Sequence, residues 1–229
     1  ANEISPVPDP REYDMLVSTG EQQTIALMAM AIQGLGVPAR SFTSAQVKVQ
    51  TDDDHARARI LRIDTERIRE ELARGGVPVL PGFQGVTDEG EITTLGRGAS
   101  DTTAVALAAA LRADVCEIFT DVTGVFTSDP RIVPNARKLP RVSYDEILEM
   151  ASLGAKVLAV RSAKIGMKYR VPIHVRSTFS DEEGTWVVPE SEVIERLVVS
   201  SVTYNRNEAK VTIFGVPDVP GIAAKIFVP

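Results

Sequence analysis

The stretch TTLGRGASDTTA, residues 93–104, places a glycine–arginine–glycine turn directly before a run of small residues that favours a helix. Gly96 and Gly98 allow the backbone to turn tightly and to approach a ligand closely. A helix start beside Arg97 is an anion-binding arrangement, because the positive end of the helix dipole lies next to a cation. The stretch alone also suits an ordinary turn. In both interpretations a strand, a turn and a helix follow one another, which is typical of an α/β protein.

Ser100 or Asp101 is expected to cap this helix, so that its first N–H groups point back toward the turn. Asp101 also stands where a dinucleotide-binding fingerprint needs its third glycine, which excludes that class of site. The sequence contains neither GxxxxGK[ST] nor GxSxG. His55 and His174 lie far apart, with no partner at metal-ligand spacing, which argues against a metal site and against histidine-based chemistry.

The composition is typical of a soluble globular protein, since 44% of the 229 residues are hydrophobic and 24% are charged. A net charge of -6 without a basic stripe argues against nucleic acid as a partner. The longest apolar runs, TIALMAMAI and AVALAAAL, are too short to span a bilayer, and the opening ANEISPVPDPRE does not resemble a signal peptide. The single cysteine, Cys116, excludes a disulfide framework within the chain and fits a reducing cytoplasm.

Helices and apolar strands alternate along residues 1–178. The predicted helices are 11–35, 65–76, 100–112, 144–152 and 156–169; the predicted strands are 37–42, 77–83, 91–95, 115–121 and 171–177, with a hairpin turn at 88–90. The apolar residues of the first helix at helical spacing are Leu16, Ile25, Met28, Ile32 and Leu35. Ser143 and Glu146 predict a capping box. The alternation predicts a mainly parallel sheet covered on both faces.

The sequence changes in character after residue 178. Residues 179–195 are polar and rich in turn-forming residues, which predicts a linker. Within 196–229, RLVVSSVTY and EAKVTIFGV around NRN predict a hairpin, and Pro220 favours a helix start. One hairpin and one helical turn cannot bury a core, so a truncated second domain is expected here.

Three further segments contain residues suited to ligand binding. FTDVTGVFTSDPR, 119–131, follows a predicted strand, and strand ends are where open α/β sheets bind ligands. Lys156 in GAK lies at a predicted helix start, where a cation is disfavoured unless an anion lies there too. Glu21 in STGEQ lies beside a glycine in a helical stretch. Each segment also has an ordinary interpretation, as a polar loop, an exposed lysine and a solvated glutamate.

Together these blocks resemble the aspartokinases of the amino-acid kinase superfamily. The resemblance runs from about Asp14 to Ile226 and is carried by STGEQ, GFQG at 82–85, TTLGRGASDTTAVALAAAL, ADVCEIFTDVTGVFTSDPRIVPNARKL, EMASLGAKVL and VTIFGVPDVPGIAAKIF. The order and spacing of these blocks are highly specific. The resemblance implies a three-layer αβα kinase domain at 1–178 with a mainly parallel sheet, a linker at 179–195, and the start of an ACT-like (ferredoxin-like α+β) regulatory domain at 196–229.

The resemblance implies transfer of the γ-phosphoryl group of ATP to the β-carboxylate of L-aspartate, the first step toward lysine, threonine and methionine. A carboxylate is already a nucleophile at neutral pH, so catalysis would consist of positioning and charge neutralisation. On the substrate side, Arg97 would clamp a carboxylate with two contacts, Glu21 would hold the ammonium group and Phe83 would wall the pocket. The residues that would add hydrogen bonds are Gly98, Ala99 and Ser100.

On the nucleotide side, the resemblance assigns Asp101 and Lys156 to catalysis, Asp101 as an organiser of cationic groups and not as a base. The ATP-binding residues that it implies are Thr120, Asp121, Phe126, Thr127, Ser128, Asp129, Pro130, Arg131 and Lys156. Mg²⁺ would accompany ATP, with no metal ligands of this chain assigned. The residues assigned to an effector, lysine or threonine, are Asp218, Gly221 and Ile222. A homo- or hetero-oligomer, without nucleic acid or membrane as partners, is expected.

The chain departs from the family pattern at three places. The KxGGTS-type phosphate loop and the initiator Met are absent, so a fragment is expected, with little or no aspartate phosphorylation by itself. Ala99 replaces a family glycine, which would cost about 1 kcal/mol if that position needs a positive φ. SFTSAQVKV lacks the glycines usual in relatives, so a different substrate loop is expected. Two alternatives stay open: a kinase for another acidic substrate, and a non-catalytic nucleotide- and amino-acid-binding fragment.

Overall fold

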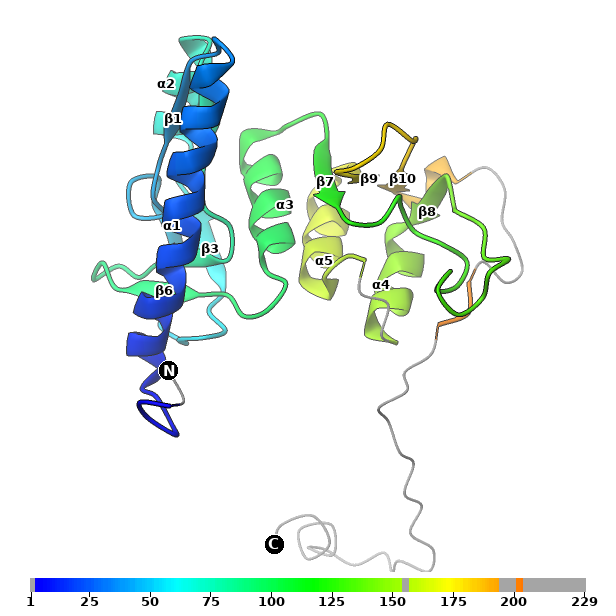
Figure 1. Ribbon diagram of the computed structural model, residues 1–229, viewed down its shortest axis with the longest axis horizontal. Helices are drawn as coiled ribbons and strands as arrows, with labels where there is room; N and C mark the ends of the chain where they lie inside the picture. Colours follow the sequence, from blue (N-terminus) through cyan, green and yellow to red (C-terminus); the bar gives the residue numbers. More distant parts are fainter. Residues whose placement is uncertain (1–2, 154–156, 194–200, 204–229) are drawn as a thin grey trace, which may run out of the picture.

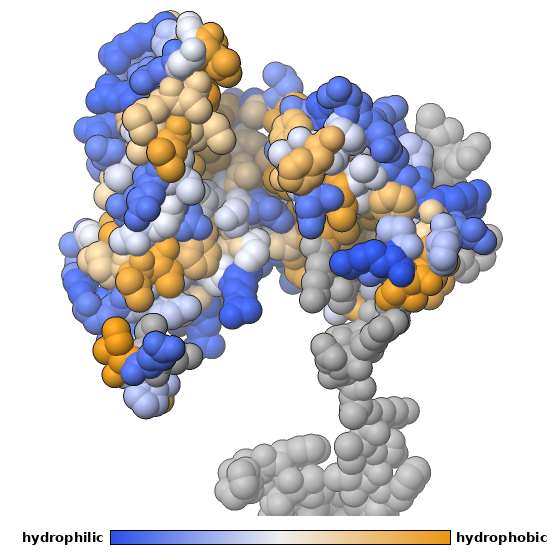
Figure 2. All heavy atoms as spheres, viewed as in Figure 1, coloured by the Kyte–Doolittle hydropathy of each residue, from blue (hydrophilic) through white to orange (hydrophobic). Residues whose placement is uncertain are grey.

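The computed structural model describes residues 3–153, 157–193 and 201–203 of the chain. It is a mixed α/β structure, as predicted. Figure 1 shows helix α1 with small sheets on one side, helix α3 in the middle, and a second sheet with helices α4 and α5 on the other side. Figure 2 shows that the surface is hollowed between these two sides. None of the helices in the described part of the chain combines the length and apolarity that a bilayer crossing needs.

The N-terminal side contains two helices and two small sheets. Its elements are α1 (Pro10–Gly34), β1 (Ala39–Ser41), β2 (Val49–Thr51), β3 (Ile60–Ile63), α2 (Glu66–Ala73), β4 (Val77–Val79), β5 (Gln84–Val86) and β6 (Ile92–Thr94). β1 and β4 pair in parallel, and the other sheet has the order β3-β2-β5-β6. β2 and β5 are parallel, whereas β2–β3 and β5–β6 are antiparallel. The β5–β6 pair is the hairpin predicted around 88–90.

Helix α1 begins at a cap formed by Asp9, whose side chain accepts hydrogen bonds from two backbone N–H groups of the first turn. The face that it buries differs from the predicted apolar stripe. The buried residues are Asp14, Ser18, Ile25 and Ala29, whereas Leu16, Met28 and Leu35 are more than half exposed. Apolar atoms therefore lie along the outside of this side of the molecule (Figure 2). Ile25 of the predicted stripe is buried as expected, but polar Asp14 and Ser18 also occupy the core face, and a periodicity search that counts only apolar residues does not detect them.

Helix α3 (Ser100–Leu111) lies between the two sides, which explains its small residues. Val105 and Ala108 belong to the core of the second sheet, while Leu107 and Leu111 pack against the N-terminal cluster that contains Val49. A helix buried on opposite faces needs short side chains where a neighbouring helix approaches closely, and α5 packs along it. The composition of SDTTAVALAAAL is thus the consequence of a central position.

The second sheet has the order β7-β9-β10-β8. The elements of this side are β7 (Cys116–Thr120), β8 (Arg141–Ser143), α4 (Tyr144–Ser152), α5 (Val160–Tyr169), β9 (Ile173–Ser177), β10 (Thr185–Val188) and the short 3₁₀ helix η1 (Glu190–Glu192). β7–β9 and β8–β10 are parallel, and β9–β10 is antiparallel. The capping box of Ser143 and Glu146 at the start of α4 is confirmed, with both of its hydrogen bonds formed.

Three strand predictions need correction. Thr185–Val188, inside the segment 179–195 predicted to be a linker, form β10, with Thr185, Val187 and Val188 buried. β3 (Ile60–Ile63) was not predicted at all. The strand predicted over 77–83 covers only Val77–Val79. In each case pairing with strands distant in sequence decides the outcome, so the local composition was a poor guide.

One helix boundary and one burial pattern also differ from prediction. β7 was expected to be wholly buried, but its side chains alternate, and Phe119 is 54% exposed. α5 begins at Val160, later than the predicted start at 156. Apart from residues 201–203, the predicted second domain at 196–229 lies outside the described residues. Within 201–203, the Val202 N–H donates a hydrogen bond to the Thr127 carbonyl.

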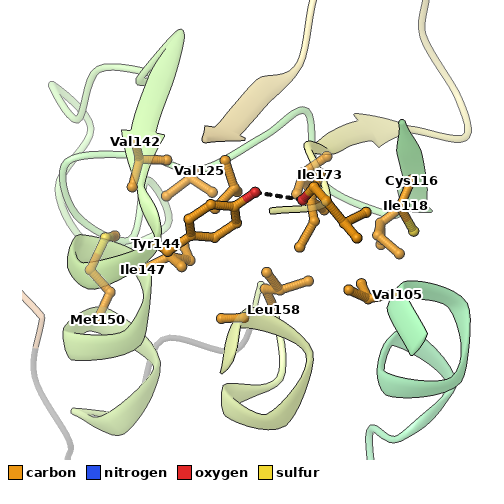
Figure 3. Close-up of a cluster of buried hydrophobic side chains, with 14 of the residues drawn as sticks. Val105, Cys116, Ile118, Val125, Val142, Tyr144, Ile147, Met150, Leu158 and Ile173 are labelled. Atoms are coloured by element: carbon orange, nitrogen blue, oxygen red, sulfur yellow. Dashed lines mark hydrogen bonds between the residues drawn. The ribbon is translucent and has the colours of Figure 1, made fainter. Parts of the chain in front are cut away.

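The core between the second sheet and its helices is closed by Tyr144 (Figure 3). Its hydroxyl donates a hydrogen bond of 2.5 Å to the Val171 carbonyl, and the residue is 3% exposed. Burial, aided by the charge of Glu192, raises the pKa of the hydroxyl to about 12. The hydroxyl therefore stays protonated and available as a donor at neutral pH.

We expect Tyr144→Phe to lower the free energy of unfolding by about 1–3 kcal/mol, because the buried Val171 carbonyl loses its partner. Urea denaturation measures the effect. The matched control is Tyr169→Phe, since Tyr169 is 57% exposed and keeps its ring against Lys168. Equal stability of the Tyr144→Phe variant and the wild-type protein would contradict the assignment.

Candidate active site

The glycine–arginine–glycine turn has the backbone geometry that its sequence predicts. Gly96 and Gly98 have φ values of 89° and 71°, in the left-handed region that glycine adopts without a steric penalty. Arg97 between them is exposed. Ala99 has a φ of -86°, so its Cβ causes no strain and the expected cost of about 1 kcal/mol does not arise. Ala99 is instead 3% exposed and packs with Leu95 in a small cluster.

Phe83 is fixed beside this turn in an uncommon backbone conformation. Its φ is 69°, which is costly for a bulky residue. Its N–H donates to the Thr103 hydroxyl at 3.1 Å, and its carbonyl accepts from the Leu95 N–H at 2.8 Å. A Cβ on the preceding Gly82 would lie 2.9 Å from the Ser100 Cβ. The GFQG segment is therefore packed against the start of α3, and the role of Phe83 as a wall of the substrate pocket stays a prediction.

The starts of α3 and α5 lie together at one edge of the molecule (Figure 1). Each is preceded by an alanine, Ala99 or Ala159, that provides no side-chain cap. The prediction that Ser100 or Asp101 caps α3 is therefore wrong. The first-turn N–H groups of both helices lack the side-chain acceptor that α4 has. Two positive helix ends beside Arg97 make this edge attractive to anions.

Asp101 connects these two helix starts. Its carboxylate accepts a hydrogen bond from the Ala159 N–H. Burial raises the pKa of Asp101 above its usual value, and the hydrogen bond from Ala159 opposes that rise only in part. Its predicted role as an organiser of cationic groups stays a prediction.

Glu21 lies half-buried in α1, three residues after Ser18, which contacts the GFQG segment. The buried Gln84 of GFQG donates through Nε2 to the Ser18 carbonyl at 3.1 Å. This bond attaches the STGEQ turn of α1 to the segment that carries Phe83. Among the contacts of the described residues, none joins the Glu21 carboxylate to Arg97. The predicted pairing of the two around one substrate stays a prediction.

The predicted ATP-binding segment follows β7, as expected. The Thr120 hydroxyl donates to Asp121 at 3.1 Å, and Phe126 forms an antiparallel bridge with Lys138. The Thr127 hydroxyl accepts from the Arg137 N–H at 3.0 Å. These contacts fold the segment back on itself at the C-terminal end of β7.

The far end of this segment carries an ion pair. Arg131 is bound by Asp129 through two side-chain hydrogen bonds of 3.0 and 2.9 Å, and Arg131 is exposed. Ser128 is half-buried and Pro130 exposed. In this structure the Arg131 guanidinium therefore contacts a carboxylate, and its predicted contact with phosphate stays a prediction.

Several predicted residues lie outside the described residues. These are Lys156 and the effector residues Asp218, Gly221 and Ile222. Within the described part of the chain, no group of three His, Cys, Asp or Glu side chains is arranged to hold a metal ion. Two cavities of about 220 and 270 Å³ lie near α2, away from the turn.

Sequence reasoning missed the residues that hold the turn from outside. Asp14 is fully buried in α1, and Arg161 of α5 reaches the carbonyl of Leu95, next to Gly96. A signal for Asp14 was present in the sequence. Asp14 lies four residues before Ser18, and Ser18 lies seven residues before Ile25. These helical spacings place the charged Asp14 on the face that the helix buries.

Comparison with known proteins finds relatives of similar sequence and solved structures of similar fold. The aspartate kinase of Pseudomonas putida is 55% identical over 230 residues, covering 100% of this chain and 56% of that protein. The crystal structure of aspartate kinase from Synechocystis has a TM-score of 0.69 at 52% identity, covering 82% of this chain and 31% of that one. E. coli aspartokinase III in complex with aspartate and ADP has a TM-score of 0.76 at 33% identity, covering 82% and 43%. The structure of the same enzyme in complex with lysine and aspartate has a TM-score of 0.71 at 33% identity, again covering 82% of this chain and 43% of that one.

This chain spans about half the length of the curated relatives that it matches. The model of the amino acid kinase family matches residues 2–177, which include the turn, Asp101 and the segment after β7. Residues 2–177 make up most of the chain, and on that basis the chain belongs to the amino acid kinase family.

Proposed function

We propose that this chain carries the catalytic region of an aspartate kinase, which transfers the γ-phosphoryl group of ATP to the β-carboxylate of L-aspartate. The relatives that support this proposal are named aspartate kinases or aspartokinases, and a solved aspartokinase of similar structure holds aspartate and ADP. The cytoplasm is the compartment in which we place the reaction.

One observation carries the proposal: Asp101 joins two uncapped helix starts beside the exposed Arg97. The reactants bring a triphosphate and a carboxylate to the same place, so the site has to offer positive potential over an extended edge. Two helix N-termini and a guanidinium supply this positive potential. This arrangement supports phosphoryl transfer between two anions.

In the proposed reaction, an oxygen of the β-carboxylate attacks the γ-phosphorus. The bond from that phosphorus to the bridging oxygen breaks, and ADP leaves with the electron pair. The nucleophile is ionised at neutral pH, so no residue has to remove a proton from it. Arg97 would bind a substrate carboxylate, Glu21 the ammonium group, and Phe83 would exclude water from one side of the pocket.

On the nucleotide side, we assign the segment from Thr120 to Arg131 to ATP and Lys156 to the transferred phosphoryl group. Mg²⁺ prefers to bind through substrate phosphates and retained waters with one or two carboxylates. We therefore expect it to arrive with ATP, and we assign it no ligand set in this chain. We further propose that residues 196–229 begin a regulatory domain through which lysine or threonine acts, in an oligomer.

The decisive experiment is aspartate-dependent ADP release by the full-length gene product, set beside an ATP titration of the same sample. Turnover with L-aspartate, and none with L-glutamate, is expected. ATP binding without turnover on any amino acid would favour a non-catalytic role. Turnover with a different acid would overturn the substrate assignment while leaving the kinase assignment in place.

We expect Arg97→Lys to raise the KM for aspartate by about tenfold or more, because lysine keeps the charge but loses the planar fork. Steady-state kinetics with aspartate and ATP varied separately measure the change. Arg112→Lys is the matched control, since Arg112 lies at the other end of α3. An unchanged KM for aspartate would remove Arg97 from the clamp.

A further inference from the structure

The turn that carries Arg97 is held from one side by Arg161, in the first turn of α5. Its guanidinium donates through Nη1 to the Leu95 carbonyl at 2.8 Å and through Nη2 to the Ala58 carbonyl at 3.0 Å. Leu95 and Ala58 are 3% and 0% exposed. The planar fork of arginine can reach two carbonyls in a fixed geometry, which one ammonium group cannot do.

The same turn is held from the other side by Asp14 of α1. Its fully buried carboxylate accepts hydrogen bonds from the N–H of Thr94 at 3.0 Å and from the Thr94 hydroxyl at 2.5 Å. It also accepts from the Ala56 N–H at 3.0 Å and contacts His55 Nδ1 at 2.8 Å. One carboxylate therefore connects α1, the loop after β2 and the end of β6.

These contacts lie immediately before the flexible part of the turn. Thr94 and Leu95 precede Gly96, and Ala58 is joined to Thr94 by a backbone hydrogen bond of 2.9 Å. Because glycine adopts many backbone conformations, the two glycines that flank Arg97 do not by themselves fix the direction in which it points. Its direction must come from how the flanking residues are fixed. On the far side of the turn, Asp101 is held by Ala159, two residues before Arg161.

We propose that Arg161 and Asp14 are positioning residues that hold the Arg97 turn where it meets the substrate carboxylate. This inference rests on the proposed function. Arg161 acts through Leu95, and Asp14 acts through Thr94, so neither residue needs to touch the substrate. The first turn of α5 thereby braces both ends of the turn, through Arg161 before it and through Ala159 after it.

The test measures aspartate and ATP kinetics of Arg161→Lys in the full-length gene product. We expect kcat/KM for aspartate to fall about ten- to a hundredfold, because a displacement of about 1 Å in a positioned group costs that much. The loss should appear mainly in the KM for aspartate, with the KM for ATP unchanged. Asp14→Asn should shift the KM for aspartate in the same direction, since an amide brings donors toward the donors of Thr94 and Ala56.

The matched control is Arg69→Lys. Arg69 also donates to a backbone carbonyl, that of Leu111 at 2.9 Å, but at the opposite end of α3. It should change thermal stability without changing the KM for aspartate. If Asp14→Asn does not fold, Arg161→Lys still decides the question.

Each outcome has a separate meaning. Wild-type protein that releases no ADP with aspartate overturns the proposed function and, with it, this inference. Active wild-type protein with an unchanged KM for aspartate in Arg161→Lys overturns the positioning role alone. The positioning role is also overturned if Arg161→Lys and Arg69→Lys both change the KM for aspartate and the KM for ATP. Such a shared change would reflect general destabilisation.

Discussion

Asp101→Asn is expected to lower kcat about 10²–10³-fold, the loss typical when a preorganised electrostatic group is removed from an active site. Asparagine keeps the shape and the oxygen that accepts from Ala159, so the two helix starts stay joined. It loses the negative charge that would orient cationic groups around the transferred phosphoryl group. The effect belongs to the transition state, so the affinity for ATP should change little. Steady-state kinetics and an ATP titration measure the two quantities.

The thermal stability of Asp101→Asn should not fall along with its activity. The pKa of Asp101 is raised in the folded protein, so the folded state binds this proton more tightly than the unfolded state. Its contribution to stability is therefore present below the unfolded pKa of about 3.9 and is lost as the pH rises through the folded pKa. At neutral pH, Asp101→Asn should unfold at a temperature equal to or above that of the wild-type protein.

Asp114→Asn is the matched control, because Asp114 is exposed in the loop after α3. It should change neither kcat nor the unfolding temperature. Weaker ATP binding with an intact kcat in Asp101→Asn would show that Asp101 serves nucleotide binding and not the transfer step.

Gly184→Ala is expected to lower the free energy of unfolding by about 3 kcal/mol or more, the upper range for overpacking a closely packed site. A Cβ at this position would lie 1.8 Å from the Val175 carbonyl oxygen. Val175 and Thr185 are paired in the β9–β10 ladder, so the strands cannot separate without losing their register. Urea denaturation measures the loss.

The change should also weaken ATP binding, since Thr185 connects the sheet to the predicted ATP segment. Its hydroxyl accepts from the Val125 N–H at 2.8 Å and donates to the Leu139 carbonyl at 2.6 Å. Gly34→Ala is the control: a Cβ there meets no atom within 4 Å. A helix favours alanine over glycine, so this control should keep or raise stability by about 0.5–1 kcal/mol. Wild-type stability in Gly184→Ala would show that β10 shifts freely.

The sequence by itself determined the features that short-range interactions control. The capping box of Ser143 and Glu146 depends on contacts within one helical turn, and the structure confirms it. The positive φ values of Gly96 and Gly98 follow from the residue type, which tolerates them at little cost. The hairpin around 88–90 and the helix from Ser100 were likewise readable from turn residues and small residues. The order and spacing of the motifs between Asp14 and Ile226 were sufficient to indicate the family.

The tertiary structure decided the features that depend on partners distant in sequence. The contact between Asp14 and Thr94 spans 80 residues, and that between Arg161 and Ala58 spans 103. No local pattern specifies which carbonyl a guanidinium will reach, because the partner is brought near only when the chain has folded. The strand β10 shows the same limit. Its polar flanking residues predicted a linker, but pairing with β9 and β8 makes it a strand. Local preference thus determined the turn and its helix, while packing across the molecule decided what holds them in place.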